Sequence, residues 1–177
     1  MLTVQSLGGW ESAVLASVRG ARGTLEERDQ QIERSGMYGE YPAILSGYLD
    51  TLRLEGAREA DRLEALKRAV FIAWYAGVAP RCLTGIGDLS DASVTETFAR
   101  LDDATRRDET DAELRAMVAH YYEACAAPFD LYGGADAAER SGPASDVEAL
   151  LASSEARFAG RGQMGEYWTA MVARARG

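Results

Sequence analysis

The sequence predicts an all-α protein, a single globular domain over residues 1–177 that contains about seven helices. Apolar residues recur at helical spacing along almost the whole chain, and no stretch alternates apolar and polar residues between turn residues. Apolar residues make up 47% and charged residues 27% of the chain, which is typical of proteins that bury a core. A chain of this length is also typical of one domain.

Caps and turn residues divide the N-terminal half of the chain into four expected helices. Glycines at positions 20 and 23 end a short first helix. Thr24 and Glu27 then form a Thr-x-x-Glu capping box, which satisfies two backbone donors and starts a polar surface helix. Pro42 suits the first turn of a third helix, which Gly56 closes. The expected ranges are 10–19, 24–34, 42–56 and 58–79.

The fourth of these helices is expected to lie at the centre of the fold. It begins as an amphipathic helix with Leu63, Leu66 and Val70 on one side, and it becomes apolar on every side over 69–79. A helix that is apolar all round is surrounded by protein rather than by water.

The C-terminal half predicts further helices separated by one long loop. Asp91 or Ser93 can cap the first of them, and Thr110 or Asp111 starts the next, which Pro128 ends. The segment 131–145 is rich in glycine and small residues, so we expect a loop with room for one short helical turn. The expected helical ranges are 91–101, 111–127, 145–158 and 165–174.

Two segments of the chain resemble each other. Residues 66–85 and 114–133 match at seven of twenty positions, and both contain Ala-Pro-x-x-Leu-x-Gly after a helix. The offset of 48 is near the period of HEAT-like repeats, but a stable solenoid needs about three units. We therefore expect a globular helical array that contains a degenerate helical repeat, with a short solenoid as the alternative. In each segment the proline should stop a helix, the leucine anchor a loop and the glycine permit a tight turn.

The two repeated segments hold the candidate binding residues. Gly85-Ile86-Gly87 does not indicate a nucleotide site, because it follows a helix and is not followed by the lysine of a P-loop. A cysteine nucleophile would need a base or a positive charge beside it, and Cys82 has only Arg81 adjacent in sequence. An incidental cysteine is the favoured interpretation, and no catalytic residue is assigned. The candidates for ligand contact are Arg81, Cys82, Thr84, Asp88, Phe129, Asp130 and Tyr132.

Neither a metal nor a cofactor is expected. The single histidine, His120, shares a helix side with Glu113 and Glu123, but Met117 occupies the position where a di-iron Glu-x-x-His motif needs glutamate. Zinc ligation by several histidines is excluded with one histidine in the chain. His120 is therefore interpreted as a boundary residue on a solvated face.

Charge limits the classes of partner. The formal net charge is −9, which disfavours nucleic acids and anionic membranes and favours a cationic partner. The longest apolar run, 69–79, has 11 residues, whereas a membrane-spanning helix needs about 20. The N-terminus lacks the features of a secretory signal, and the two cysteines lie 43 residues apart, so a cytoplasmic protein with reduced thiols is expected. Abundant alanine, with 18 arginines against one lysine, is typical of a GC-rich bacterial genome.

These observations favour a non-catalytic protein that binds another, basic protein, as an inhibitor, an immunity-type factor or an adaptor. The alternative is a small-molecule binder, or a metal-independent enzyme, with a pocket between the two Ala-Pro-x-x-Leu-x-Gly loops. A homo-oligomer that assembles through its helix faces is the third hypothesis.

Overall fold

The computed structural model describes residues 2–142, 145–153 and 155–177. Every regular element in these ranges is a helix, and seven of the helices have ten residues or more, so the predicted fold class is confirmed. The helices are α1 (Val4–Gly20), α2 (Leu25–Arg34), η1 (Met37–Gly39), α3 (Glu40–Arg53), α4 (Glu59–Tyr75), α5 (Arg81–Thr84), α6 (Asp91–Arg106), α7 (Ala112–Ala124), α8 (Ala127–Tyr132), α9 (Ala135–Arg140), α10 (Ser145–Leu151), η2 (Glu155–Phe158) and α11 (Gly162–Arg176).

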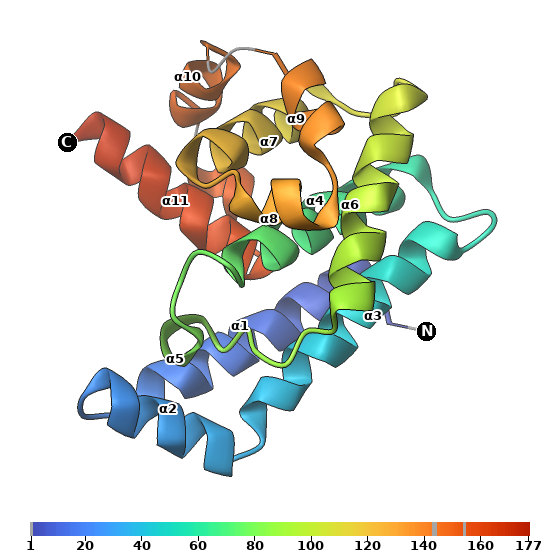
Figure 1. Cartoon of the computed structure of the whole chain (residues 1–177). Helices are drawn as coiled ribbons and strands as arrows, with labels where there is room; N and C mark the ends of the chain where they lie inside the picture. Colours follow the sequence, from blue (N-terminus) through green and yellow to red (C-terminus); the bar gives the residue numbers. More distant parts are fainter. Residues whose placement is uncertain (1, 143–144, 154) are drawn as a thin grey trace.

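Helix α4 lies at the centre of the fold, as its apolar sequence predicts. In the view of Figure 1, α1, α2, α3 and α5 lie below it, and α7, α9 and α10 lie above it. It packs against α1, α3, α6, α8 and α11, and all its side chains from Ala65 to Trp74 are buried. The helix ends at Tyr75, earlier than predicted, because the chain turns over 76–79. The described part of the chain contains no helix that is long and apolar enough to cross a membrane.

Helix α1 begins earlier than its sequence suggested. Thr3 and Ser6 form a capping box, in which the Ser6 N–H donates to the Thr3 side chain at 3.1 Å. Gly8 therefore lies inside the helix rather than before it. A Cβ at this position would collide with the guanidinium group of Arg68, so the glycine allows α1 and α4 to come close together. The predicted Thr24–Glu27 capping box is confirmed at the start of α2.

The two repeated segments fold in similar ways. Each Ala-Pro pair leads into a short helix, α5 or α8, and each helix ends at a glycine with positive φ, Gly85 at 76° or Gly133 at 96°. The expected role of the shared leucines is wrong. Leu83 is 40% exposed and Leu131 is 73% exposed, so neither side chain anchors its segment in the core.

Gly85 is a position where backbone conformation and packing both demand glycine. The backbone of Gly85 is in the left-handed conformation, which residues with a Cβ rarely adopt. A Cβ there would also lie 2.9 Å from Val18 Cγ2 and 3.1 Å from Val14 Cγ1. We expect Gly85→Ala to lower the free energy of unfolding by about 2 kcal/mol, measured by urea denaturation. Gly56→Ala is the control, because φ at Gly56 is also positive, at 83°, but no atom lies within 4 Å of the position that the Cβ would take. This substitution should lower the free energy of unfolding by only about 1 kcal/mol. Equal losses would mean that Val14 and Val18 accommodate the methyl group.

The C-terminal third is more helical than predicted. The expected loop over 131–145 contains the end of α8 and all of α9. The predicted helix over 145–158 is divided into α10 and the short helix η2, and the last helix is longer at both ends than its predicted range, 165–174. These short helices complete the layer above α4, since α9 packs on α6 and α7 and α10 packs on α7 and α11.

A network of ion pairs crosses the interior where α4, α7 and the start of α11 meet. Arg161 donates to Glu64 at 2.9 Å and to Glu113 at 2.7 Å, and its side chain is only 12% exposed. Lys67 donates to the same oxygen of Glu113 at 2.9 Å. Arg68, one turn after Glu64, donates to it at 2.7 Å. The buried charges of α4 thus find their partners on other helices or within α4 itself.

Glu11 extends this polar interior to α1 and α3. Its fully buried carboxylate accepts hydrogen bonds from the Tyr48 hydroxyl and from the Gln163 backbone N–H, the latter at 3.0 Å. Arg68 in turn donates to the Tyr48 oxygen at 3.3 Å. Gly162 makes room for the carboxylate, because a Cβ there would collide with it. Helices α1, α3 and α11 are therefore joined at one buried carboxyl group.

Candidate functional site

A cleft of about 550 Å³ opens between the two repeated segments. Its walls come from four parts of the chain: the C-terminal end of α4, the α5 segment and the loop after it, the start of α6, and α8. Figure 1 shows that the loop after α5 runs past α1 and α3 before it enters α6. The lining residues are Ala73, Ala76, Gly77, Arg81, Ile86, Gly87, Leu89, Asp91, Val94, Ala127, Pro128, Leu131 and Tyr132.

The surface of the cleft is mainly apolar. Ile86 and Val94 are buried in its wall, and Leu89 is half-buried beside them. Leu131 also lines the cleft, and at 73% exposure it is the most exposed large apolar side chain among the described residues. A free leucine beside an apolar cleft is the kind of surface that another molecule can cover.

Arg81 lines the cleft, and its charge is already compensated. Its guanidinium donates to both carboxylate oxygens of Asp29, at 2.9 and 2.8 Å, and lies 4.3 Å from the ring centre of Tyr38. Glu33 and Asp88 approach it at 3.7 and 3.9 Å. Hydrogen bonds from Arg81 and then Tyr38 lower the pKa of Asp29 below its usual value, so this carboxyl group is ionised at neutral pH. Three carboxylates therefore surround one guanidinium group, and the local net charge is negative.

A second acidic group in the lining of the cleft is Asp91. The Tyr132 hydroxyl donates to the Asp91 carboxylate at 2.9 Å, and both residues line the cleft. This hydrogen bond raises the pKa of Tyr132, so the phenol stays neutral and the negative charge stays on Asp91. Asp91 is also the first residue of α6, where a carboxylate interacts favourably with the helix dipole.

The candidate residues from the sequence fall into three positions. Arg81 and Tyr132 line the cleft. Asp88 and Asp130 are exposed, with Asp88 in the left-handed conformation at φ 54°. The remaining candidates are buried in the core: Cys82, Thr84 and Phe129.

The buried candidates have structural contacts. Cys82 is 4% exposed and is not among the residues that line the cleft. Thr84 accepts a hydrogen bond from the Ile86 N–H at 3.1 Å, and its carbonyl accepts one from Gln163 at 3.2 Å. The Phe129 ring lies 4.8 Å from that of Phe98. These side chains shape the walls from behind and have no direct access to the cleft.

His120 lies in a different environment from the solvated face expected for it. It is half-buried against an aromatic cluster of α4, α7 and α11, with Nε2 2.7 Å from the Tyr167 hydroxyl. Burial lowers its pKa, so the ring is neutral at neutral pH. Over the described ranges, no three His, Cys, Asp or Glu side chains are grouped as metal ligands would be.

Sequence reasoning missed two features of the cleft. Asp29 belongs to a polar surface helix, and only the fold brings it to Arg81. Leu131 was interpreted as an anchor, although its position near the end of a short helix, between two polar or aromatic neighbours, is compatible with exposure.

No family model, no curated protein and no solved structure matches the chain significantly.

Proposed function

We propose that this chain is a non-catalytic protein-recognition module, and that the cleft between the two repeated segments binds an apolar side chain of a basic partner. The exposure of Leu131 beside an apolar cleft is the observation that carries this proposal. Burying such a leucine in a complex contributes about 1.5–3 kcal/mol, which is comparable to an interface hot spot.

Charge defines the kind of partner. Asp29, Glu33 and Asp88 surround the single guanidinium of Arg81, and Asp91 adds a carboxylate to the lining of the cleft. The whole chain carries a net charge of −9. An apolar residue flanked by lysine or arginine would therefore meet complementary charge beside the cleft, which raises the rate of association and favours one orientation.

A random-peptide display selection against the whole protein tests this proposal. We expect enriched peptides to combine a large apolar residue with lysine or arginine. Leu131→Asp should weaken their binding at least about tenfold, measured by fluorescence anisotropy, because it places a charge at the apolar contact. Leu54→Asp is the matched control, since Leu54 is 40% exposed but follows α3 and does not line the cleft, and it should leave binding unchanged.

Two outcomes would contradict the proposal. One is that no peptide with this pattern is enriched, and the other is that the enriched peptides bind Leu131→Asp as well as they bind the wild type. A molar mass that rises with concentration in light scattering, and no longer does so in Leu131→Asp, would instead indicate self-assembly through this face.

A small-molecule site in the same cleft is the second candidate. The volume of about 550 Å³ lies within the usual range of ligand pockets, roughly 300–1,000 Å³. A metabolite that raises the melting temperature of the wild type, but not that of Arg81→Ala, would favour it. The close pairing of Arg81 with Asp29 is the reason to rank it second, because that guanidinium is not free to hold an anionic ligand.

A further inference from the structure

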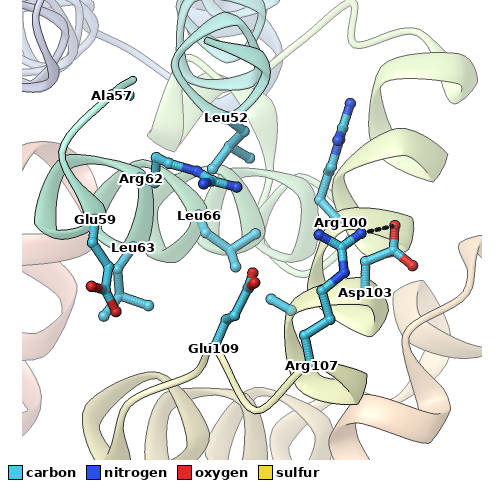
Figure 2. Close-up of a pocket in the computed structure, with 11 residues that line it drawn as sticks. Leu52, Ala57, Glu59, Arg62, Leu63, Leu66, Arg100, Asp103, Arg107 and Glu109 are labelled. Atoms are coloured by element: carbon cyan, nitrogen blue, oxygen red, sulfur yellow. Dashed lines mark ion pairs between the residues drawn. The ribbon is translucent and has the colours of Figure 1, made fainter. Parts of the chain in front are cut away.

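A second cavity, of about 390 Å³, lies at the opposite end of α4 and α6 from the cleft. It is formed by the end of α3, the loop before α4, the first turns of α4, the last turns of α6 and the loop after α6. Figure 2 shows its lining residues, which are Leu52, Ala57, Glu59, Arg62, Leu63, Leu66, Arg100, Asp103, Ala104, Arg107 and Glu109. No residue lines both this cavity and the cleft.

The cavity has an apolar floor. Leu52 and Leu66 belong to the core, at 9% and 3% exposure, and Ala104 of α6 lies with them at 9%. Leu63, one turn before Leu66, is half-buried and packs against the same core. A ligand here can therefore bury one apolar side chain, since a volume of about 390 Å³ lies at the lower end of the range of ligand pockets.

Charged groups surround this floor, and several of them have no partner. Arg62, Glu59 and Glu109 form no ion pair within the described ranges. Figure 2 shows the Arg62 guanidinium and the Glu109 carboxylate approaching the space over Leu66 from opposite sides.

Arg107, which follows the last residue of α6, is only loosely held. One of its nitrogens lies 3.9 Å from an oxygen of Asp103, whose other oxygen pairs closely with Arg106. Arg100, by contrast, points away from the floor in Figure 2 and pairs with Glu96 at 3.3 Å. Arg62 and Arg107 therefore offer free hydrogen-bond donors at the cavity, whereas the Arg100 guanidinium faces away from it.

The balance of charge selects the ligand class. Three guanidinium groups and three carboxylates line the cavity, so a pure anion or a pure cation would meet repulsion as well as attraction. A ligand with both an ammonium and a carboxylate would satisfy both sets. Guanidinium groups bind carboxylates with two parallel hydrogen bonds, and glutamate side chains accept from ammonium groups.

We propose that this cavity binds a free α-amino acid with an apolar side chain. The ligand carboxylate lies against Arg62 and Arg107, its ammonium group lies against Glu109, and its side chain lies on Leu52, Leu63 and Leu66. This site is independent of the cleft between the repeated segments and of what binds there.

Isothermal titration calorimetry with the full chain tests the assignment. The probes are leucine, methionine and phenylalanine, and we expect at least one of them to bind with a dissociation constant in the millimolar range or below. Three analogues of leucine then test the three parts of the site: N-acetyl-leucine lacks the ammonium group, leucinamide lacks the carboxylate, and glycine lacks the side chain. Each should bind at least about tenfold more weakly than leucine, because each leaves one part of the site without its partner.

Two variants connect binding to the cavity. Arg62→Gln and Glu109→Gln should each weaken binding at least about tenfold, and both should fold normally because the residues are exposed. Arg58→Gln is the matched control, since Arg58 precedes the same helix and pairs with Asp61 outside the cavity. Leu131→Asp should also leave binding unchanged, which separates this site from the cleft. The proposal is overturned if none of the three amino acids binds, if N-acetyl-leucine or leucinamide binds as well as leucine, or if Arg58→Gln weakens binding as much as Arg62→Gln.

Discussion

Arg161→Met is expected to lower the free energy of unfolding by about 3–5 kcal/mol, measured by urea denaturation at neutral pH. Arg161 is nearly buried and donates to two carboxylates, Glu64 and Glu113, which belong to α4 and α7. Methionine has a similar length but no charge, so both carboxylates would lose a partner inside the protein. Breaking a buried pair costs much more than breaking an exposed one, because the remaining charge is poorly solvated.

The control for this prediction is an exposed pair. Arg58, at 82% side-chain exposure, pairs with Asp61, and Arg58→Met should leave the unfolding midpoint unchanged within error. If Arg161→Met were equally harmless, water would be reaching Glu64 and Glu113 in the folded protein.

Acid should reduce the cost of losing Arg161. Burial acts to raise the pKa of Glu113, but hydrogen bonds from Arg161 and Lys67 outweigh it and hold the pKa at about 2. A carboxyl group with a lowered pKa stabilises the folded state above its ordinary pKa of 4.5, and this contribution is lost as the pH falls from 4.5 towards 2. The difference between the wild type and Arg161→Met should therefore shrink over that interval.

The helical fold could be predicted because its signals are local. The apolar run over 69–79 identifies α4 as the central helix, and Thr24 with Glu27 identifies the start of α2. The boundaries failed where distant residues decide them. The first helix was predicted to begin at residue 10, but Gly8 lies inside α1, where it accommodates Arg68 from α4.

The candidate sites could be predicted only in part. The repeat directed attention to Arg81 and Tyr132, which do line one cleft, but nothing in the sequence places Asp29 against Arg81. Charged residues converge from separate helices in all the sites described above. The sequence did contain one signal for the buried ion pairs. Lys67 and Arg68 directly precede the apolar run 69–79, and charged side chains in such a place need buried partners, which are Glu113 and Glu64.

Glu11 gives the second large effect, and its sign is opposite to that of Glu113. Burial raises the pKa of Glu11 to about 7, although hydrogen bonds from Tyr48 and Gln163 act to lower it. The ordinary pKa of a glutamate side chain is 4.5. Between pH 4.5 and about pH 7, the folded state therefore holds a proton on Glu11 that the unfolded chain has already released. The folded state is therefore favoured at low pH, and this contribution disappears as the pH rises through about 7.

Urea denaturation of the wild type and Glu11→Gln between pH 5 and 8 measures this contribution. We expect the stability of the wild type, relative to that of Glu11→Gln, to fall by about 2–3 kcal/mol over this interval, at about 1.4 kcal/mol per pKa unit. The difference between the two proteins is the quantity to follow, because the lowered pKa of His120 makes the stability of both rise with pH over part of the same range. Glu55→Gln removes the same charge from an exposed position and should run parallel to the wild type. A constant difference between the wild type and Glu11→Gln would show that Glu11 is already ionised at pH 5, so that the buried carboxylate joining α1, α3 and α11 is charged throughout.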